Sequence, residues 1–391
     1  MNFELSEEQE MLCEAAREAL ARTDTLAAAR AGLDGGPGEA GQAPAWDVAV
    51  RGGWTGLLAD EDGRHELGAL NAMLVLIECG RRLAATGLVG HLAAVSVLHA
   101  AGADLSALAS GRRRAVYVPA RPPVADEPFL VETGDPARPY GPLPELDGGR
   151  VTGRVAFVPD LPGADLLVVP VRRPDGVAAV LVEAGAGGVK VEPLVRGDAT
   201  RPLGHLTLDG AEAAPPAAEP SDLERAWDLA QALTAAEALG VCEAVQEMAV
   251  GYARDRSAFG RPIGSYQAVK HQLVDILRYG ANVRALLYYA GYAAEHAPEE
   301  FTRAAGCARV AGEHAAGYAT RTCIAVHGGI GATWEHDAHL FYRRALLSRL
   351  LYGGEGFAAE RVALDLLAGA FEPSPEALAR LGGARLQRRD P

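Results

Sequence analysis

The fold of this chain is decided at Arg256-Ser-Ala-Phe-Gly-Arg-Pro-Ile-Gly264, a corner between two long helical patterns. Phe259-Gly260 predicts a tight exit from the first helix, and Pro262 prevents that helix from continuing. Arg256 ends the helix, where a guanidinium can bind a pyrophosphate through two parallel hydrogen bonds, which lysine does less well. The alternative is an ordinary helix–turn–helix corner with an arginine on its surface.

A glycine-rich stretch further along, His327-Gly-Gly-Ile-Gly-Ala-Thr-Trp-Glu335, precedes another helical segment. Gly328, Gly329 and Gly331 would let main-chain amides approach an anionic or carbonyl-bearing ligand at a helix N-terminus. The alternative is glycine packing between helices. Taken together, the two stretches favour a ligand site over two unrelated structural corners.

Three segments of different character make up the chain. Residues 1–112 carry apolar residues at three- and four-residue intervals, which predicts an N-terminal helical domain. Residues 113–217 are dense in proline and glycine with short β-branched runs, which predicts a middle antiparallel β-barrel or sandwich domain. Residues 218–391 return to long helical patterns, which predict a C-terminal four-helix-type bundle. The predicted fold class is therefore α+β.

Element positions follow from the same patterns. Strands are expected within 115–118, 154–158, 166–171, 177–182 and 189–191, and a Ser6–Gln9 capping box is expected to start the first helix. Long helices are expected at 221–256, 266–295, 299–326 and 335–351, with another after Gly353-Gly354. Helices of roughly thirty residues are much longer than average, so they indicate a bundle.

Composition narrows the class of protein. The chain has 391 residues, 49% hydrophobic and 23% charged, which is typical of a soluble globular protein with more than one packed unit. Its formal net charge of −14 argues against a nucleic-acid partner. The five cysteines lack the spacing of metal ligands, so no metal site is expected. The cysteines are expected to be reduced thiols. With no signal peptide and no membrane-spanning run, a cytoplasmic location is expected.

The two quoted stretches resemble the flavin-binding part of the acyl-CoA dehydrogenase family, and the likeness extends over essentially the whole chain. The resemblance implies that FAD lies between the β domain and the C-terminal bundle, with a neighbouring subunit completing its adenosine end. It implies a homodimer, a homotetramer or a hetero-oligomer with a homologous subunit. The cofactor-binding residues implied are Arg256, Phe259, Gln267, Gly328, Gly329 and Gly331.

Two departures from the family pattern concern the cofactor. The glutamine that usually precedes the glycine loop is replaced by Ala325. The middle domain lacks the Glu-Pro-Gly-x-Gly-Ser-Asp signature that meets the flavin and the acyl thioester. Its nearest counterpart, around Val124 to Thr133, keeps only scattered acidic residues.

The catalytic carboxylate of the family is not at its usual place. Aligning the segment 351–356 on its tyrosine puts Gly353 at that position, and aligning it without a gap from Gly328 puts Tyr352 there. Glu355 is the nearest carboxylate and is the candidate base, the alternative being a solvated acid at a helix start. A second family position, on the first long helix, holds Ala230.

Other charged residues are expected to have ordinary roles. Glu224 and Glu237, on that same helix, are expected to be surface charges. Arg343 and Arg344 are expected to be interface or pairing cations.

Three functions remain open at this point. The first is α,β-desaturation of an acyl thioester, carried by coenzyme A or a carrier protein, in fatty acid or secondary metabolism. An electron-transfer flavoprotein or oxygen would then be the electron acceptor. The second is a catalytically silent subunit that completes the flavin site of a heteromeric acyl-CoA dehydrogenase. The third is a flavin-dependent oxygenase of the same fold, which needs no base for an α-proton.

Overall fold

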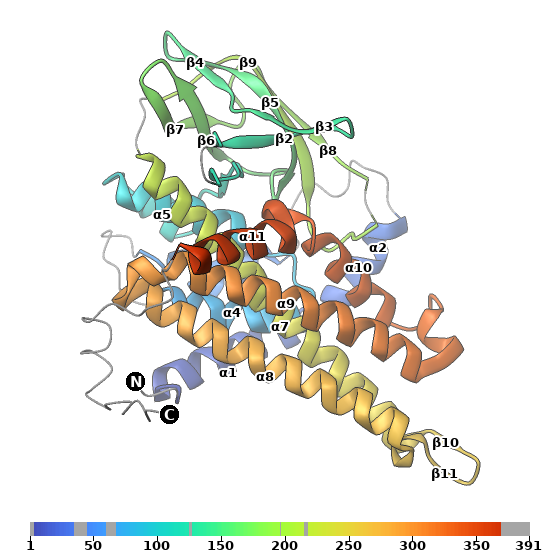
Figure 1. Ribbon diagram of the computed structural model, residues 1–391. Coiled ribbons are helices and arrows are strands. Elements are labelled where there is room, and N and C mark those ends of the chain that lie inside the picture. The colour runs from blue at the N-terminus through green and yellow to red at the C-terminus, as the bar shows by residue number, and fades with distance from the viewer. Residues whose placement is uncertain are drawn as a thin grey trace, which may run out of the picture.

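Helices from both ends of the chain pack together beneath a β domain formed by its middle (Figure 1). The computed structural model describes residues 4–34, 45–59, 68–124, 127–195, 197–214 and 218–368. The α+β class is confirmed, with strands in the middle of the chain and helices on both sides of them.

The N-terminal helices begin with the predicted capping box, in which the Ser6 hydroxyl accepts from Gln9 N–H and the Gln9 side chain accepts from Ser6 N–H. Their bounds are α1 Glu7–Ala21, α2 Thr25–Asp34, α3 Trp46–Arg51, α4 Gly68–Arg81, α5 Leu88–Ala100 and α6 Ser106–Ala109, with a 3-10 turn η2 at Trp54–Gly56. Helices α4 and α5 are buried on nearly every face because they pack against the C-terminal helix α7 (Pro220–Asp255).

His91 joins this helical part to the β domain from a fully buried position on α5. Ala115 N–H donates to His91 Nδ1 at 3.2 Å, and His91 Nε2 lies 3.3 Å from the Thr55 carbonyl. The two contacts require the neutral ring with its proton on Nε2. Burial lowers the pKa of His91 from 6.5 to about 4.

This burial predicts a loss of stability in acid. The unfolded chain takes up a proton at His91 near pH 6.5, whereas the folded chain resists it until pH about 4. The free energy of unfolding should therefore fall across that window, by about 3 kcal/mol from this residue. In urea titrations over this range, His91→Gln should flatten the profile, whereas replacing the exposed His271 with glutamine should not. An unchanged slope in His91→Gln would contradict this account.

The β domain is a mixed sheet rather than the antiparallel one predicted. Its strands are β1 Ala115–Tyr117, β2 Leu130–Asp135, β3 Arg138–Pro142, β4 Glu145–Asp147, β5 Arg150–Pro159, β6 Leu166–Arg173, β7 Gly176–Glu183, β8 Val189–Pro193 and β9 Leu203–Glu212. The main sheet has the order β1-β6-β4-β5-β9-β8, with β7 paired to β6, and β2–β3 form a separate hairpin. β1 and β4 both pair with β6 in the parallel direction, so the chain crosses over before it reaches β6.

The C-terminal helices match the predicted ones closely. They are α7, α8 Gln267–His296, α9 Pro298–His327, α10 Ala338–Ser348 and α11 Gly354–Leu367. The fourth is shorter than the predicted 335–351. His336 Nδ1 accepts from Ala338 N–H before the helix starts, and the chain turns into the left-handed region at Tyr352 after it ends. Residues 369–391, part of the predicted bundle domain, lie outside the described residues.

Close contact between α4 and α7 fixes the two helical parts against each other. A Cβ built on Gly80 would stand 2.1 Å from the Glu237 carbonyl oxygen, and one on Gly240 would stand 2.0 Å from that of Ile77. The helices can cross at this distance only with glycine at both positions. In the described part of the chain, none of the helices combines the length and apolar character that crossing a bilayer requires.

Candidate functional site

The predicted corner is a short hairpin that projects from the end of the bundle opposite the β domain (Figure 1). Arg256 is the C-cap of α7, and β10 (Ser257–Ala258) pairs with β11 (Arg261–Pro262). Phe259 stands between these strands with φ 52 and is 98% exposed. A phenylalanine held in a left-handed turn and left in water is unfavourable, which marks the tip as a contact surface.

Contacts with Tyr266 hold the hairpin in place, whereas the Arg256 side chain has no partner among the described residues. Tyr266 donates through its hydroxyl to the Ala258 carbonyl at 3.0 Å, and the Arg261 guanidinium lies 4.1 Å from the centre of the Tyr266 ring. Arg256 is exposed and makes no side-chain hydrogen bond or ion pair with the residues that the structure describes. Its five N–H donors are therefore available to an anion.

The glycine loop lies at the same end of the bundle as the hairpin. It begins where α9 ends and forms a 3-10 turn, η4, over Gly328–Ala332. The Tyr252 ring, in the last turn of α7, stacks on His327 with 4.3 Å between ring centres. The sequence prediction that the two stretches share one site is therefore consistent with their placement, and both Gly328 and Gly329 are exposed.

Two histidines close the glycine loop at its base. His327 precedes the loop and His336 follows it, and their ring centres lie 4.3 Å apart. The outer side of the loop is held by Arg30 of α2, which donates to the Trp334 carbonyl and pairs with Asp337. Packing at both ends therefore fixes the main-chain groups of the loop before any ligand arrives.

Two of the loop glycines should respond differently to alanine. At Gly331 a Cβ would lie 2.8 Å from the Ile324 carbonyl oxygen, whereas at Gly329 it would meet nothing within 4 Å. Gly331→Ala should therefore lower the free energy of unfolding by about 1–3 kcal/mol. Gly329→Ala should change it by less than about 0.5 kcal/mol. Yet Gly329→Ala should weaken binding of a ligand that approaches the loop, which equilibrium titration would measure. Equal stability losses in the two variants would contradict this.

The segment expected to carry the base is a tight turn that follows α10. Tyr352 is 2% exposed and adopts φ 52, a conformation that costs a tyrosine about 1–3 kcal/mol. The turn is fixed from two helices: Gln231 donates to the Tyr352 carbonyl at 2.7 Å, and Arg309 donates to the Leu351 carbonyl at 2.9 Å. Burial, together with Asp160, raises the pKa of the Tyr352 phenol, which excludes it as a base near neutral pH.

Glu355 lies in the first turn of α11 and forms an ion pair with Arg349. Its side chain is 30% exposed. An acid at this position is stabilised by the helix dipole. Phe357, two residues further on, packs against Trp227 at 5.7 Å between ring centres. Because residues two apart in a helix point in nearly opposite directions, Glu355 points away from that contact.

Comparison with known proteins shows which families and structures this chain is similar to. Residues 224–367 match the family model described as acyl-CoA dehydrogenase, C-terminal domain. Acyl-CoA dehydrogenase FadE34 of Mycobacterium tuberculosis is 32% identical over 352 residues, covering 89% of this chain and 46% of FadE34. Acyl-CoA dehydrogenase IpdE2 of the same organism is 35% identical over 204 residues, covering 52% of this chain and 59% of IpdE2. The chain thus spans about half the length of these curated relatives.

The whole fold agrees with this match. A chain of the solved Tcur3481–Tcur3483 steroid ACAD superposes with a TM-score of 0.79 and 27% identity, covering 93% of this chain and 99% of that one. The chain belongs to the acyl-CoA dehydrogenase family. The turn at 351–354, where the resemblance places the family's glutamate, holds Leu351, Tyr352, Gly353 and Gly354.

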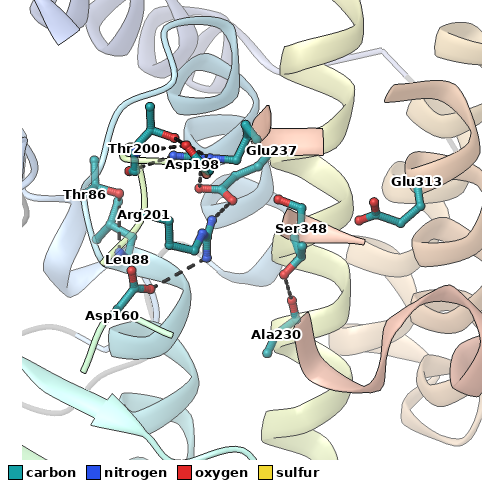
Figure 2. Close-up of polar contacts among 12 residues, drawn as sticks. Thr86, Leu88, Asp160, Asp198, Thr200, Arg201, Ala230, Glu237, Glu313 and Ser348 are labelled. Carbon is teal, nitrogen blue, oxygen red and sulfur yellow. Dashed lines mark hydrogen bonds and ion pairs between the residues drawn. The ribbon is translucent and has the colours of Figure 1, made fainter. Parts of the chain in front are cut away.

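A buried chain of charges lies beside this turn and joins the β domain to the bundle. Figure 2 shows Arg201, from the segment before β9, between Asp160 at the end of β5 and Glu237 of α7. Arg344 of α10 continues the chain, with Nη1 3.6 Å from Glu237 Oε1 and Nε 3.1 Å from Asp198 Oδ2. All five side chains are at most 4% exposed.

Burial alone would lower the pKa of Arg201, but Glu237 and Asp160 outweigh it and raise the pKa above the usual range. Arg344 is held by further contacts, donating from Nη2 to the Thr200 carbonyl at 2.8 Å. Buried charged side chains need partners of opposite sign, so the chain of charges fixes the β domain on the helices.

This arrangement corrects the expectation that Glu237 is a surface charge, because it is 3% exposed and paired with Arg201. The reason is that α7 runs through the centre of the molecule and is covered by α4, α5, α8 and α9. Arg344 is indeed a pairing cation, as predicted, and Arg343 donates to the Gly197 carbonyl at 2.8 Å. Arg201 was not singled out from the sequence, where only its place in a proline- and glycine-rich segment is visible.

The bundle end carries several groups that bind anions. It offers the unpaired Arg256, exposed main-chain groups at Gly328 and Gly329, and an exposed aromatic ring at Phe259. Gln267 is also exposed there, as the first residue of α8, while Ala325 offers no side-chain donor. No group of three or more His, Cys, Asp or Glu suited to a metal occurs among the described residues.

Proposed function

We propose that this chain is a subunit of an FAD-dependent acyl-CoA dehydrogenase that forms an α,β double bond in an acyl thioester. Family membership supports the reaction class, and the relatives that share the fold include one solved as PigA with FAD and proline. The observation that carries the proposal is the unpaired Arg256 beside the open glycine loop at one exposed end of the bundle. Its donors can bind a pyrophosphate through two parallel hydrogen bonds, which lysine does less well.

The complete flavin site requires two subunits. The hairpin projects away from the β domain of its own chain (Figure 1), so a dinucleotide bound there does not reach the β domain of the same subunit. We infer that the hairpin and glycine loop hold the phosphates and adenosine of the FAD whose ring end lies against a neighbouring subunit. The exposed side chains of Phe259, Ile330 and Trp334 around this end support contact with a partner.

Each part of the chain then has a defined task. Bound FAD would supply the oxidising group, which accepts the β-hydrogen of the thioester as hydride. Arg256 and the loop amides would neutralise the phosphates, and Phe259 would cover them from water. The five buried charges would hold the β domain in a fixed position relative to α10 and the turn at 351–354. Electrons would leave to an electron-transfer flavoprotein or to oxygen, in a cytoplasmic setting.

A second candidate is a catalytically silent subunit of a heteromeric enzyme. It is favoured by one observation: the segment that the resemblance aligns with the family's glutamate holds the buried Tyr352 and, next to it, Gly353. The similar steroid ACAD named for two components, Tcur3481 and Tcur3483, supports an assembly of different chains. In that case the homologous partner would supply the carboxylate that accepts the α-proton, and this chain would complete the partner's flavin site.

One purification distinguishes the two candidates. The chain is produced alone and together with a homologous subunit, and the visible absorption of bound FAD is measured before and after anaerobic addition of an acyl-CoA. Bleaching by the chain alone supports the dehydrogenase. Bleaching only in the presence of the partner supports the silent subunit. Absence of FAD from both preparations, even after reconstitution, would refute both.

A further inference from the structure

Helix α8, on the outside of the bundle, has an apolar stripe that the described chain leaves exposed (Figure 1). Val274 and Leu277 are 55% and 56% exposed, and Ala281 and Ala285 are exposed as well. Their spacing of three, four and four residues places them on one face of the helix. A different stripe, which includes Ile276, is buried where α8 packs on α7 and α9. The helix is therefore apolar on two faces, and its own chain covers one of them.

A groove of about 420 Å³ lies between this stripe and α7. Tyr288 lines it, and the ion pair of Arg284 with Glu243 stands at its edge. Gly280 lines it too, and a Cβ built there would meet Cys242 Sγ at 3.6 Å, an ordinary contact. Packing within this chain thus does not require glycine at this position, although glycine is unfavourable in the middle of a helix. Its effect is to leave the groove deeper.

The order of large and small side chains makes the stripe complementary to itself. Leu277 and Ala285 each lie four residues from Ala281, and Val274 and Tyr288 each lie seven residues from it. If a two-fold axis passes beside Ala281, an antiparallel copy brings Leu277 against the small Ala285 of the other helix, and Val274 against Tyr288. Both contacts then form twice, as a closed symmetric interface requires.

The charges along α8 favour the same antiparallel orientation. Lys270 is exposed near the start of the helix, and Glu295 is exposed near its end. An antiparallel copy brings Lys270 of each helix toward Glu295 of the other and places opposite ends of the helix dipoles together, whereas a parallel copy brings like charges together. Among residues 267–294, Asp275 is the only acid, so the net charge of −14 causes little repulsion at this face.

We propose that this face of α8 binds the same face of a second copy of the chain, with the two helices antiparallel and crossing at Ala281. Leu277 of each copy then fills the groove of the other, and the exposed apolar stripe is removed from water. This inference goes beyond the proposed function and does not need bound FAD. The hairpin and the glycine loop remain a separate surface, at the end of the bundle where α8 begins.

The test compares Leu277→Asp with Gln272→Asp in the full chain, by light scattering at micromolar concentration. Leu277→Asp should halve the particle mass, because it buries a charge in an apolar contact, and circular dichroism should show an unchanged fold because Leu277 is exposed in the single chain. Gln272→Asp adds the same charge at an exposed position on another face of α8 and should keep the parent's mass. A parent chain that is monomeric, or that assembles only with a homologous chain, would overturn the proposal. So would a Leu277→Asp variant with the parent's mass.

A second experiment tests where the helices cross. Ala281→Cys should form a disulfide-linked dimer on mild oxidation, because residues beside the two-fold axis come close enough for the bond. Asn282→Cys, about 100° further round the helix, should not, and the parent with its five free cysteines gives the background. Equal cross-linking of the two variants would overturn the proposed crossing.

The FAD content of the same samples separates this inference from the proposed function. If FAD never binds but Leu277→Asp halves the mass, the proposed function fails and the α8 interface stands. If FAD binds and Leu277→Asp keeps the parent's mass, the α8 interface alone fails.

Discussion

Replacement of Arg256 with alanine should weaken FAD binding by the assembled protein by about 10- to 100-fold. The estimate follows from losing charge-assisted hydrogen bonds to a phosphate, each worth about 1.5–3 kcal/mol. Arg256→Lys should recover only part of the affinity, because an ammonium cannot form the two parallel bonds of a guanidinium. Equilibrium titration of the apoprotein with FAD, followed by flavin fluorescence, measures each effect.

The neighbouring Arg254 provides a matched control. It is an exposed arginine in the last turn of the same helix, two residues from Arg256. Arg254→Ala removes the same charge from the same helix end and should leave the affinity within about 3-fold, because screened surface charges act weakly. If Arg254→Ala and Arg256→Ala weaken FAD equally, the effect is general electrostatics and the hairpin is not a phosphate site.

Replacement of Arg201 with methionine should lower the free energy of unfolding by about 3–5 kcal/mol. Methionine keeps much of the volume but leaves Asp160 and Glu237 buried, with Arg344 at 3.6 Å as the remaining cation near Glu237. Removing one partner of a buried pair is this unfavourable because the other charge stays out of water. Urea unfolding at neutral pH, read by circular dichroism, measures the loss.

Two further variants show whether the buried pairing is the cause. Arg172→Met breaks the exposed pair with Glu145, whose side chains are 52% and 66% exposed, and should change stability by less than about 1 kcal/mol. The double variant Arg201→Met with Glu237→Leu should recover part of the loss, since it removes the stranded carboxylate. A double variant as unstable as the sum of its single variants would show that the two residues are not coupled.

Local signals in the sequence were enough for the helices and the exposed corner. The second long helix was predicted at 266–295 and is observed at Gln267–His296, because Pro262 and the period of apolar residues fix its start. The corner after α7 was also predicted at the end of that helix, although the β10–β11 pairing within it was not. The glycine-rich stretch follows α9 rather than starting α10. In these cases the cause lies within a few residues of the effect.

The environments of the acidic residues could not be predicted in this way. Glu237 looks like any surface acid on a helix, yet its partner Arg201 comes from a loop that precedes β9. The parallel pairing of β1 with β6 is likewise set between distant segments. Charge pairing and strand direction depend on tertiary contacts, which local patterns do not contain.

The central claim is that the hairpin and the glycine loop of one subunit hold the phosphates of FAD. Amide hydrogen exchange of the assembled protein, measured with and without FAD, tests it most directly. Residues 256–262 and 328–333 should both become protected on FAD binding. At an FAD concentration that only just saturates the parent, Arg256→Ala should reduce this protection in both. Binding of FAD that leaves the two stretches exchanging at their original rates would contradict the account.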